Sequence, residues 1–418
     1  MKKKTFFFLL IFHFSFFILH FSIASSIEVG GHLTEDTIWS PDNNPYHVID
    51  NIYVDEGVTL TILPGTEIYI QSAPLTSWQD FNEHFWYQNG TNDAKMFWID
   101  GRIIAEGTEQ DSILFTRLQD DNDYFWGTIY ITDDAGESIF KYCTLENAGG
   151  LGIYVGLIAY GMITFMNKEL EIERCKFLNY VAGLHGNNVQ WYEYVSVVNN
   201  IFQINNEMSE YAATHYKEHL LINNPIDGYP PPLIAGNEFI GSYRIDFPTG
   251  YFISNKLISN ESIGVDIGGR HKKVYIYDNE FIDYENGITC WGVSGDSIYI
   301  KNNRFIGGNE AINIDDAYVE ISDNYFEGCD LTANHSYSSK IINNIFSNSS
   351  GTAISGNVSV ITNNIISNYN RGLSGRGDEL FSNNIFIDNN YIFSSVTDNH
   401  IIENNIFISN DELYMNFL

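Results

Sequence analysis

The sequence NNIF at residues 343–346 recurs as NNII at 363–366, as NNIF at 383–386 and as NNIF at 404–407. Looser copies reach back to residue 199 and bring the total to ten, with steps of 37, 18, 24, 24, 21, 20, 20, 20 and 21 residues between their second residues. The 418 residues are enough for about two or three ordinary domains. A short and regular repeat instead predicts one elongated domain in which each copy is a structural unit.

Each repeat predicts one coil of a solenoid made of β-strands. We call the recurring four-residue motif the Asn phrase. Apolar and polar residues alternate around the phrase, as at Val358, Val360 and Ile365, which is typical of short strands. A period of about 20 residues is too short for a pair of helices, and the leucine pattern of leucine-rich repeats is missing. Coils stacked about 4.8 Å apart place each repeated Asn over the next, so that its amide donates to one neighbour and accepts from the other. We therefore expect an Asn ladder inside the turn and a column of Phe and Ile beside it.

Segments outside the repeat resemble a known family. Residues 55–62 (DEGVTLTI), with Pro64-Gly65-Thr66, look like the N-terminal segment of the secreted right-handed parallel β-helix proteins, which carry PbH1 repeats and share the pectate-lyase-like fold. Residues 103–108, 113–116 and 126–130 look like the first coils of that family. The resemblance implies an all-β, right-handed, single-stranded parallel β-helix, with about 20–24 residues per coil in this sequence. It is specific for the fold and says little about activity, because one fold hosts many functions.

The sequence divides into three parts. Residues 1–26 combine Lys2, Lys3 and Lys4 with an apolar run and small residues, the pattern of a signal peptide, so we expect a secreted protein at the cell surface or outside the cell. Residues 27–100 form an N-terminal cap segment with an aromatic insertion, and residues 101–418 form the coils. A second insertion covers about 205–232, with a short helix expected from Glu207 to Leu221.

The C-terminus lacks a polar capping unit after the last repeat. An open solenoid end exposes strand edges and core residues. The sequence therefore predicts either a chain truncated at this end or a contact there with a second domain or another copy.

The charge balance excludes some partners. Lys and Arg number 21 against 53 Asp and Glu, a formal net charge of −32. Nucleic acids and anionic membranes would be repelled, so we expect neither nucleic acid binding nor a membrane contact once the signal peptide is removed. Cys143 and Cys175 fall at the ladder position and are expected to be buried free thiols.

Polar residues recur at one outward strand position after each phrase. If these strands form one parallel sheet, their side chains form a column: His185, Asp246, Asp266, Thr289, Asn313, Thr332, Ser355 and Ser374. In relatives with lyase or hydrolase activity, the equivalent face carries the site. Asp246 and Asp266 would then stand on consecutive coils, with Arg244 beside them and Arg270 and His271 downstream.

Two carboxylates so close require a proton, a cation or an Arg between them. One alternative is a Ca²⁺ site formed by Asp246, Asp266, Asp315 and Asp316, with Arg244 or Arg270 assisting β-elimination. A second alternative is glycoside hydrolysis with the pair as acid and base. A third is a solvated acidic stripe. No complete motif of a known lyase or polygalacturonase is present, so no cofactor is certain and enzymatic activity stays open.

The sequence therefore predicts a secreted β-helix protein that binds carbohydrate or another extracellular polymer. The candidate ligand-binding residues are Trp78, Trp86, His185, His271 and Asn313. A polysaccharide lyase or glycoside hydrolase using Asp246, Asp266, Arg244 and Arg270 is the first alternative. A structural stalk or adhesin segment is the second.

Overall fold

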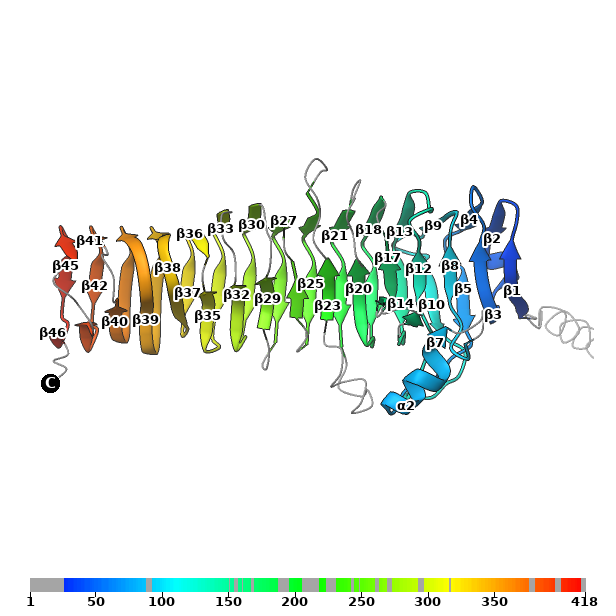
Figure 1. The fold of residues 1–418 in the computed structure, drawn as a ribbon, viewed down its shortest axis with the longest axis horizontal. Coiled ribbons are helices and arrows are strands. Elements are labelled where there is room, and N and C mark those ends of the chain that lie inside the picture. Colours follow the sequence, from blue (N-terminus) through cyan, green and yellow to red (C-terminus); the bar gives the residue numbers. More distant parts are fainter. Residues whose placement is uncertain are drawn as a thin grey trace, which may run out of the picture.

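The computed structural model describes residues 26–87, 92–149, 151–153, 157–159, 161–166, 169–186, 195–204, 218–222, 231–241, 244–247, 249–259, 263–268, 273–291, 297–315, 317–375, 380–394 and 400–414. The described strands form an elongated stack of coils, with the N-terminal coils at one end and the C-terminal coils at the other (Figure 1). Each coil contributes one strand to each of three faces, and strands on a face pair in parallel with those of the coils before and after.

Face A carries the outward polar column. Its strands are β1(Ile27–Leu33), β3(Tyr46–Val54), β8(Phe97–Ile99), β12(Ile129–Ile131), β17(Ile163–Phe165), β20(Ala182–Gly186), β23(Glu218–Ile222), β26(Arg244–Asp246), β29(Ile263–Gly268), β32(Asn286–Trp291), β35(Glu310–Asp315), β38(Asp330–Ile342), β39(Ile345–Thr362), β40(Ile365–Ser374), β43(Tyr391–Phe393) and β46(Glu412–Tyr414).

Face B precedes the Asn turn of each coil. Its strands are β2(Thr37–Trp39), β4(Thr59–Ile62), β9(Arg102–Glu106), β13(Ser138–Lys141), β18(Leu170–Glu173), β21(Val195–Val198), β24(Leu233–Ala235), β27(Gly250–Ile253), β30(Lys273–Tyr277), β33(Ser297–Lys301), β36(Tyr318–Ser322), the later parts of β38 and β39, β41(Leu380–Ser382) and β44(Ile401–Glu403).

Face C follows the Asn turn. Its strands are the first parts of β1 and β3, then β5(Glu67–Ile70), β10(Ile113–Arg117), β14(Cys143–Glu146), β19(Lys176–Leu178), β22(Ile201–Gln203), β25(Glu238–Ile240), β28(Lys256–Ile258), β31(Glu280–Ile282), β34(Arg304–Ile306), β37(Tyr325–Glu327), the first parts of β39 and β40, β42(Ile385–Ile387) and β45(Ile406–Ile408).

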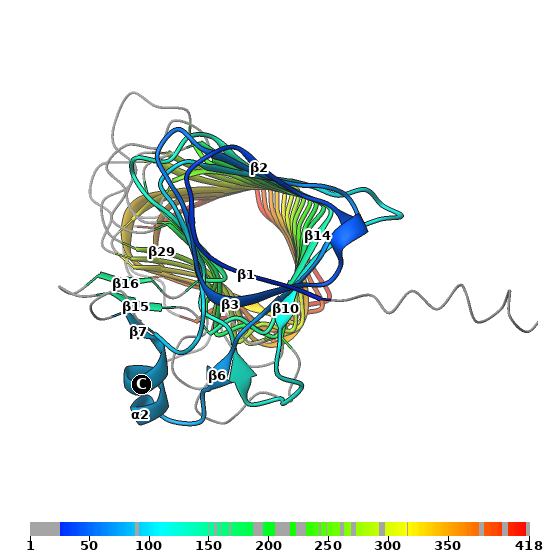
Figure 2. The ribbon, with the colours of Figure 1, turned by 90° about the vertical axis from the view of Figure 1, so that its right-hand side faces the viewer.

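The helix is right-handed. Figure 2 looks along the axis from the N-terminal end, and the chain passes from β2 at the top, through the short 3₁₀ helix Pro41–Asn43 at the right, to β3 at the bottom. The chain therefore turns clockwise as it recedes. The fold predicted from the resemblance, a right-handed parallel β-helix, is confirmed. No helix among the described residues is long and apolar enough to cross a membrane.

The repeated Asn residues form a ladder between faces B and C. Each side-chain amide donates to the Oδ1 atom of the Asn in the next coil, over 2.9–3.1 Å. The members are Asn200, Asn237, Asn255, Asn279, Asn303, Asn324, Asn344, Asn364, Asn384 and Asn405. Cys175 precedes them, its backbone N–H donating to Asn200 Oδ1 at 2.7 Å. Cys143 occupies the position before that, and both thiols are free and buried.

The residue before each ladder Asn has a left-handed backbone, with φ between 55° and 66°. This conformation is costly for most side chains and easier for Gly, Asn and Asp. The positions are accordingly occupied by Asn, Asp, Ser or Gly, as at Asn302, Asp323 and Gly236. The phrase thus encodes a turn residue, a ladder residue and then an inward apolar residue.

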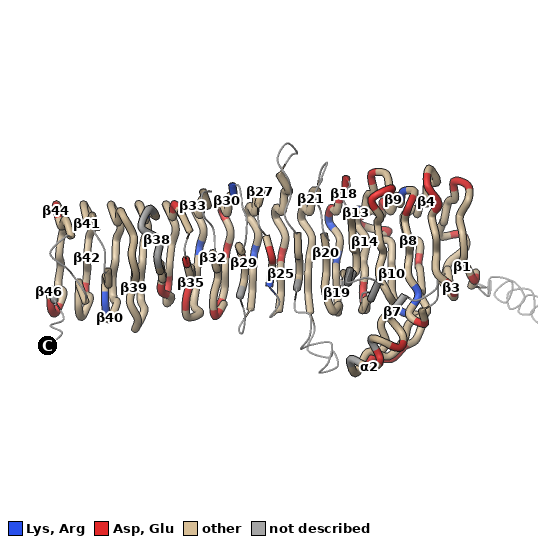
Figure 3. The backbone as a smooth tube through the Cα atoms, viewed as in Figure 1, with Lys and Arg blue, Asp and Glu red and all other residues tan. Residues whose placement is uncertain are grey.

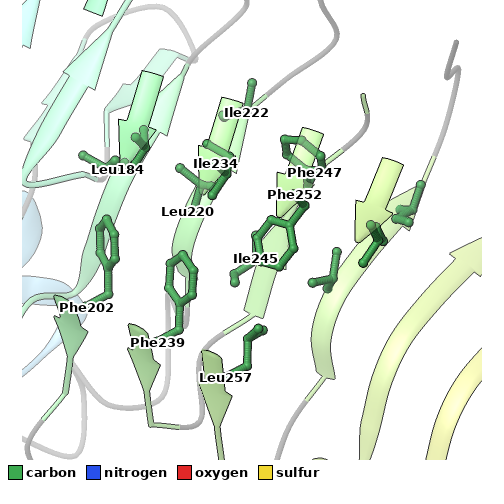
Figure 4. Packing of buried hydrophobic residues seen from close by; sticks show 14 of the residues in the cluster. Leu184, Phe202, Leu220, Ile222, Ile234, Phe239, Ile245, Phe247, Phe252 and Leu257 are labelled. Atoms are coloured by element: carbon green, nitrogen blue, oxygen red, sulfur yellow. The ribbon is translucent and has the colours of Figure 1, made fainter. Parts of the chain in front are cut away.

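The interior is a continuous apolar core. Phe281, Phe305, Phe326 and Phe346 stack on face C with ring centroids 4.4–4.9 Å apart. Figure 4 shows the same arrangement earlier in the helix, where Phe202, Phe239 and Leu257 on one face meet residues such as Ile245 and Phe252 across the interior. Burial of these side chains is the main stabilising contribution expected for such a fold.

An aromatic segment projects from the N-terminal coils. It contains β6(Ala73–Pro74), α2(Trp78–Asp80), a π-helical turn Phe81–Phe85 and β7(Trp86–Tyr87). β6 pairs with β11(Tyr124–Phe125), and β7 joins β15(Leu151–Ile153) and β16(Leu157–Ala159) in a small sheet outside the ring (Figures 1 and 2). Phe85 is fully buried here. The segment is therefore anchored by packing to two later loops.

Other sequence predictions have mixed outcomes. The expected helix from Glu207 to Leu221 is wrong at its C-terminal end, because Glu218–Ile222 is strand β23 and pairs with β20 and β26; residues 205–217 lie outside the described part. The division into residues 1–26, 27–100 and 101–418 stays a prediction, as does a contact at the C-terminal end. The last described coil exposes Ile401, Ile406 and Phe407.

Candidate functional site

The polar column predicted from the sequence lies on the outside of face A. Strand pairing places its members directly opposite one another and extends the column toward the N-terminus. In order, they are Tyr53, Trp98, Tyr130, Thr164, His185, Leu221, Asp246, Asp266, Thr289, Asn313, Thr332, Ser355 and Ser374. We call this set the outer column. The period-2 alternation of each strand directs these side chains away from the core.

Asp246 and Asp266 are consecutive members of the outer column, and Arg244 lies between their charges. Arg244 is two residues before Asp246 on β26, so both side chains leave the same side of the strand. Its Nη2 atom is 3.0 Å from Asp246 Oδ2, and its Nη1 atom is 3.8 Å from Asp266 Oδ2. Two neighbouring carboxylates were expected to have a proton, a cation or an Arg between them, and in the structure this group is Arg244.

Trp291 completes the group, and sequence reasoning missed it. It is the last residue of β32, and its indole N–H donates to Asp266 Oδ1 over 2.8 Å. The ring nevertheless remains 50% exposed, while the Asp266 side chain is only 12% exposed. A largely enclosed carboxylate thus fixes the orientation of an exposed aromatic side chain.

Gly268 makes room for the Trp291 ring. The two residues are opposite each other on β29 and β32. A Cβ atom at Gly268 would lie 2.3 Å from the Cε2 and Cζ2 atoms of the indole, far inside contact distance. The absence of a side chain therefore lets the indole lie against the strand. We call Arg244, Asp246, Asp266, Gly268 and Trp291 the Trp291 site.

The C-terminal neighbours of this site are polar. Asp315 is exposed and lies opposite Trp291 in the register of β35. Asn313 donates its side-chain amide to Glu310 Oε2 at 2.7 Å. Beyond it, the hydroxyl groups of Thr332 and Ser355 lie 3.2 Å apart. The outer column thus presents amide and hydroxyl groups over several coils beyond the two carboxylates.

The predicted metal ligands are not all in the described part of the structure. Asp246 and Asp266 are adjacent, whereas Asp315 belongs to a strand two coils further on, and Asp316 lies outside the described residues. The described residues contain no group of three or more His, Cys, Asp or Glu side chains that could hold a metal ion. The Ca²⁺ site stays a prediction.

The other predicted site residues are differently placed. His185 is a member of the outer column but is only 6% exposed, and burial lowers its pKa to about 4. The backbone of α2 and β7 places Trp78 and Trp86 in the projecting segment, but their side chains lie outside the described part. Arg270 and His271 also lie outside it.

A second aromatic group occupies the N-terminal end of the outer column. Trp98 and Tyr130 lie 4.8 Å apart by ring centroids, and the Trp98 indole donates to Asp100 over 3.0 Å. Burial, followed by the charges of Asp133 and Asp100, raises the pKa of Tyr130 to about 12. With Tyr130 only 7% exposed, this group is more enclosed than Trp291.

Comparisons with known proteins return distant structural similarity. No family model matches the sequence, and no curated protein matches it. Tailspike protein 3 of bacteriophage CBA120 is 10% identical with a TM-score of 0.26, over 95% of this chain and 55% of that protein. The GH136 lacto-N-biosidase of Eubacterium ramulus is 8% identical with a TM-score of 0.28, over 86% of this chain and 63% of the enzyme. Neither similarity is close enough to transfer a residue or an activity.

Proposed function

We propose that this protein is secreted and binds a glycan through the Trp291 site. The observation that carries the proposal is the half-exposed Trp291 ring, fixed by its hydrogen bond to the nearly buried Asp266. An aromatic side chain combines a large apolar face with a polar edge, and a fixed orientation lowers the entropy lost on binding. A sugar ring has the complementary combination of an apolar face and hydroxyl groups at its rim.

The polar groups around Trp291 suit hydroxyl recognition. The carboxylates of Asp246 and Asp266 can accept hydrogen bonds from sugar hydroxyls, and the Arg244 guanidinium, 43% exposed, can donate to them. Thr289, Asn313 and Thr332 continue the outer column with neutral polar groups. A polymer lying along the axis would contact several coils, each about 4.8 Å from the next.

Binding is favoured over catalysis by the position of Arg244. Its Nη2 atom contacts Asp246 at 3.0 Å and its Nη1 atom lies 3.8 Å from Asp266, so one positive charge already stands between the two carboxylates. Glycoside hydrolysis needs one carboxylic acid to protonate the leaving group while the other carboxylate acts as nucleophile or base. The Arg244 guanidinium lies between the two carboxylates, where the scissile glycosidic bond would have to lie for them to act as such a pair.

The test is a retention assay on immobilised polysaccharides with the full chain. The panel comprises cellulose, chitin, chitosan, a β-1,3-glucan, mannan and polygalacturonate. We expect retention on at least one polymer, and loss of that retention in Trp291→Ala. The matched control is Tyr251→Ala, which removes another exposed aromatic residue from face B. Retention by none of the polymers, or equal retention of Trp291→Ala, would refute the proposal.

Release of sugar fragments from the same panel is measured in parallel. The binding proposal predicts no product. A product formed by the unmodified chain and lost in Asp246→Asn or Asp266→Asn would instead establish the polysaccharide-cleaving alternative.

A further inference from the structure

The charges around Trp291 point to a particular class of glycan. The Trp291 site contains two carboxylates and one guanidinium, and the exposed carboxylate of Asp315 lies opposite Trp291 on the next coil. Counted over the described residues, the charge of this surface is therefore negative, as is that of the whole chain, at −32. We propose that the glycan bound at the Trp291 site is a polymer of amino sugars with free, protonated amines. This proposal rests on the proposed function and specifies its ligand.

The geometry offers a place for an ammonium group. Asp266 Oδ1 accepts the indole hydrogen bond, whereas Arg244 Nη1 is 3.8 Å from Oδ2, too far for a hydrogen bond. An ammonium group next to Oδ2 would form a charge-assisted hydrogen bond there. The half-exposed Trp291 ring meets the same carboxylate through its N–H edge, and Trp is the aromatic residue that attracts cations most strongly.

Long-range electrostatics favour the same class. Low-salt association is accelerated when ligand and protein carry opposite charges and slowed when the charges are alike. Acidic side chains recur along the whole length of the molecule and are dense over the N-terminal coils (Figure 3). A polyuronate would meet repulsion from all of them, a neutral glycan would gain nothing, and a polyamine sugar would be attracted.

The experiment compares three pentasaccharides by calorimetry at pH 6, using the full chain. They are β-1,4-linked glucosamine, its fully N-acetylated counterpart and oligogalacturonate, so that the first two share one sugar backbone and differ in whether the amine is free and charged or acetylated and neutral. We expect the glucosamine oligomer to bind at least about tenfold more tightly than the acetylated one, and the oligogalacturonate to bind most weakly. Raising the salt from 0.05 to 0.5 M should reduce that preference several-fold.

Asp266→Asn is the informative variant, because the Asn side chain keeps an oxygen that can accept the indole hydrogen bond while losing the charge. It should lose about tenfold in affinity for the glucosamine oligomer and little for the acetylated one. Asp388→Asn is the matched control, since Asp388 is an exposed turn residue with φ 53° in a distant C-terminal coil. Equal weakening by both variants would assign the effect to overall charge and overturn the proposal.

The possible failures are distinguishable. If the acetylated oligomer binds as tightly as the amine, and Trp291→Ala abolishes binding of both, the amino-sugar proposal is wrong and the glycan-binding function stands. If no oligosaccharide binds here and no polysaccharide retains the chain, both proposals are wrong.

Discussion

The indole N–H of Trp291 donates a 2.8 Å hydrogen bond to the carboxylate of Asp266, 25 residues earlier in the sequence. One coil of the helix separates the two residues, which lie on neighbouring strands of the same face. The bond turns the aromatic ring along the surface instead of away from it. The proposed binding surface depends on this arrangement.

Gly268→Ala should displace the Trp291 ring. The added Cβ would lie 2.3 Å from the indole carbons, so the ring must move away from the strand. We expect loss of most of the polysaccharide retention, with a change in unfolding free energy of no more than about 1 kcal/mol. Retention and urea unfolding measured together check this. Unchanged retention would show that the contact between the Trp291 ring and Gly268 does not contribute to binding.

Asn303→Ala should destabilise the helix strongly. The side chain accepts from the backbone and side chain of Asn279 and donates to Ile276 O and Asn324 Oδ1, all in the interior. Leaving these buried groups without partners should cost about 3 kcal/mol or more. The control is Asn302→Gly at the exposed preceding residue, where φ is 55° and Gly is well tolerated. Similar denaturation midpoints for the two variants would contradict a stabilising ladder.

Cys175→Asn should leave the helix intact and stabilise it by about 1 kcal/mol. Asn at this position would extend the ladder toward Cys143, whose backbone N–H now meets the sulfur of Cys175 at 3.4 Å. Cys290→Asn is the matched control, because Cys290 is fully buried in the apolar column between Ile267 and Ile314, away from the ladder. It should destabilise by a few kcal/mol. The unfolding free energies of both variants, measured by chemical denaturation, test this prediction. A lower value for Cys175→Asn than for the unmodified chain would contradict the ladder register.

Acidification should weaken the fold through His219. This residue is fully buried, with Nδ1 2.5 Å from the hydroxyl of Tyr180, and burial lowers its pKa from 6.5 to about 3. Below pH 6.5 His219 binds a proton in the unfolded chain but not in the folded chain. The stability of the fold therefore falls as the pH drops from about 6.5 toward 3. The effect is on the order of a few kcal/mol.

The measurement is the difference in unfolding free energy between the unmodified chain and His219→Gln at several pH values. Titration of the many carboxylates is common to both proteins and cancels. We expect the gap between the proteins to shrink as the pH falls below 6.5. A gap that does not vary with pH would mean that His219 titrates normally in the folded state.

The fold was predictable because its rules are local and repeated. The spacing of the Asn phrase indicated both the length of a coil and the stacking of Asn303 on Asn324. The outward strand position likewise brought Asp246 and Asp266 together in the predicted register. Period-2 alternation and constant coil length suffice for such inferences.

The binding surface was less predictable because it depends on exceptions to the repeat. Trp291 lies two residues beyond the outer column, and only the contact with Gly268 and Asp266 shows where its ring lies. His185 holds an outward position yet is buried, and a Cβ atom added at Gly161 would lie 3.0 Å from its Cβ atom. The repeat specifies the direction of a side chain, whereas additional segments decide whether it reaches solvent.

The most direct test of the central claim follows the indole N–H resonances of the seven Trp residues by ¹⁵N NMR. Trp291→Phe identifies the resonance of Trp291, and the glucosamine pentasaccharide or the best polymer fragment from the retention assay is then titrated. We predict that the Trp291 resonance shifts with ligand concentration while that of Trp98 stays in place. A Trp291 resonance that does not move while the ligand binds would contradict the account, because the glycan would then be bound elsewhere on the molecule.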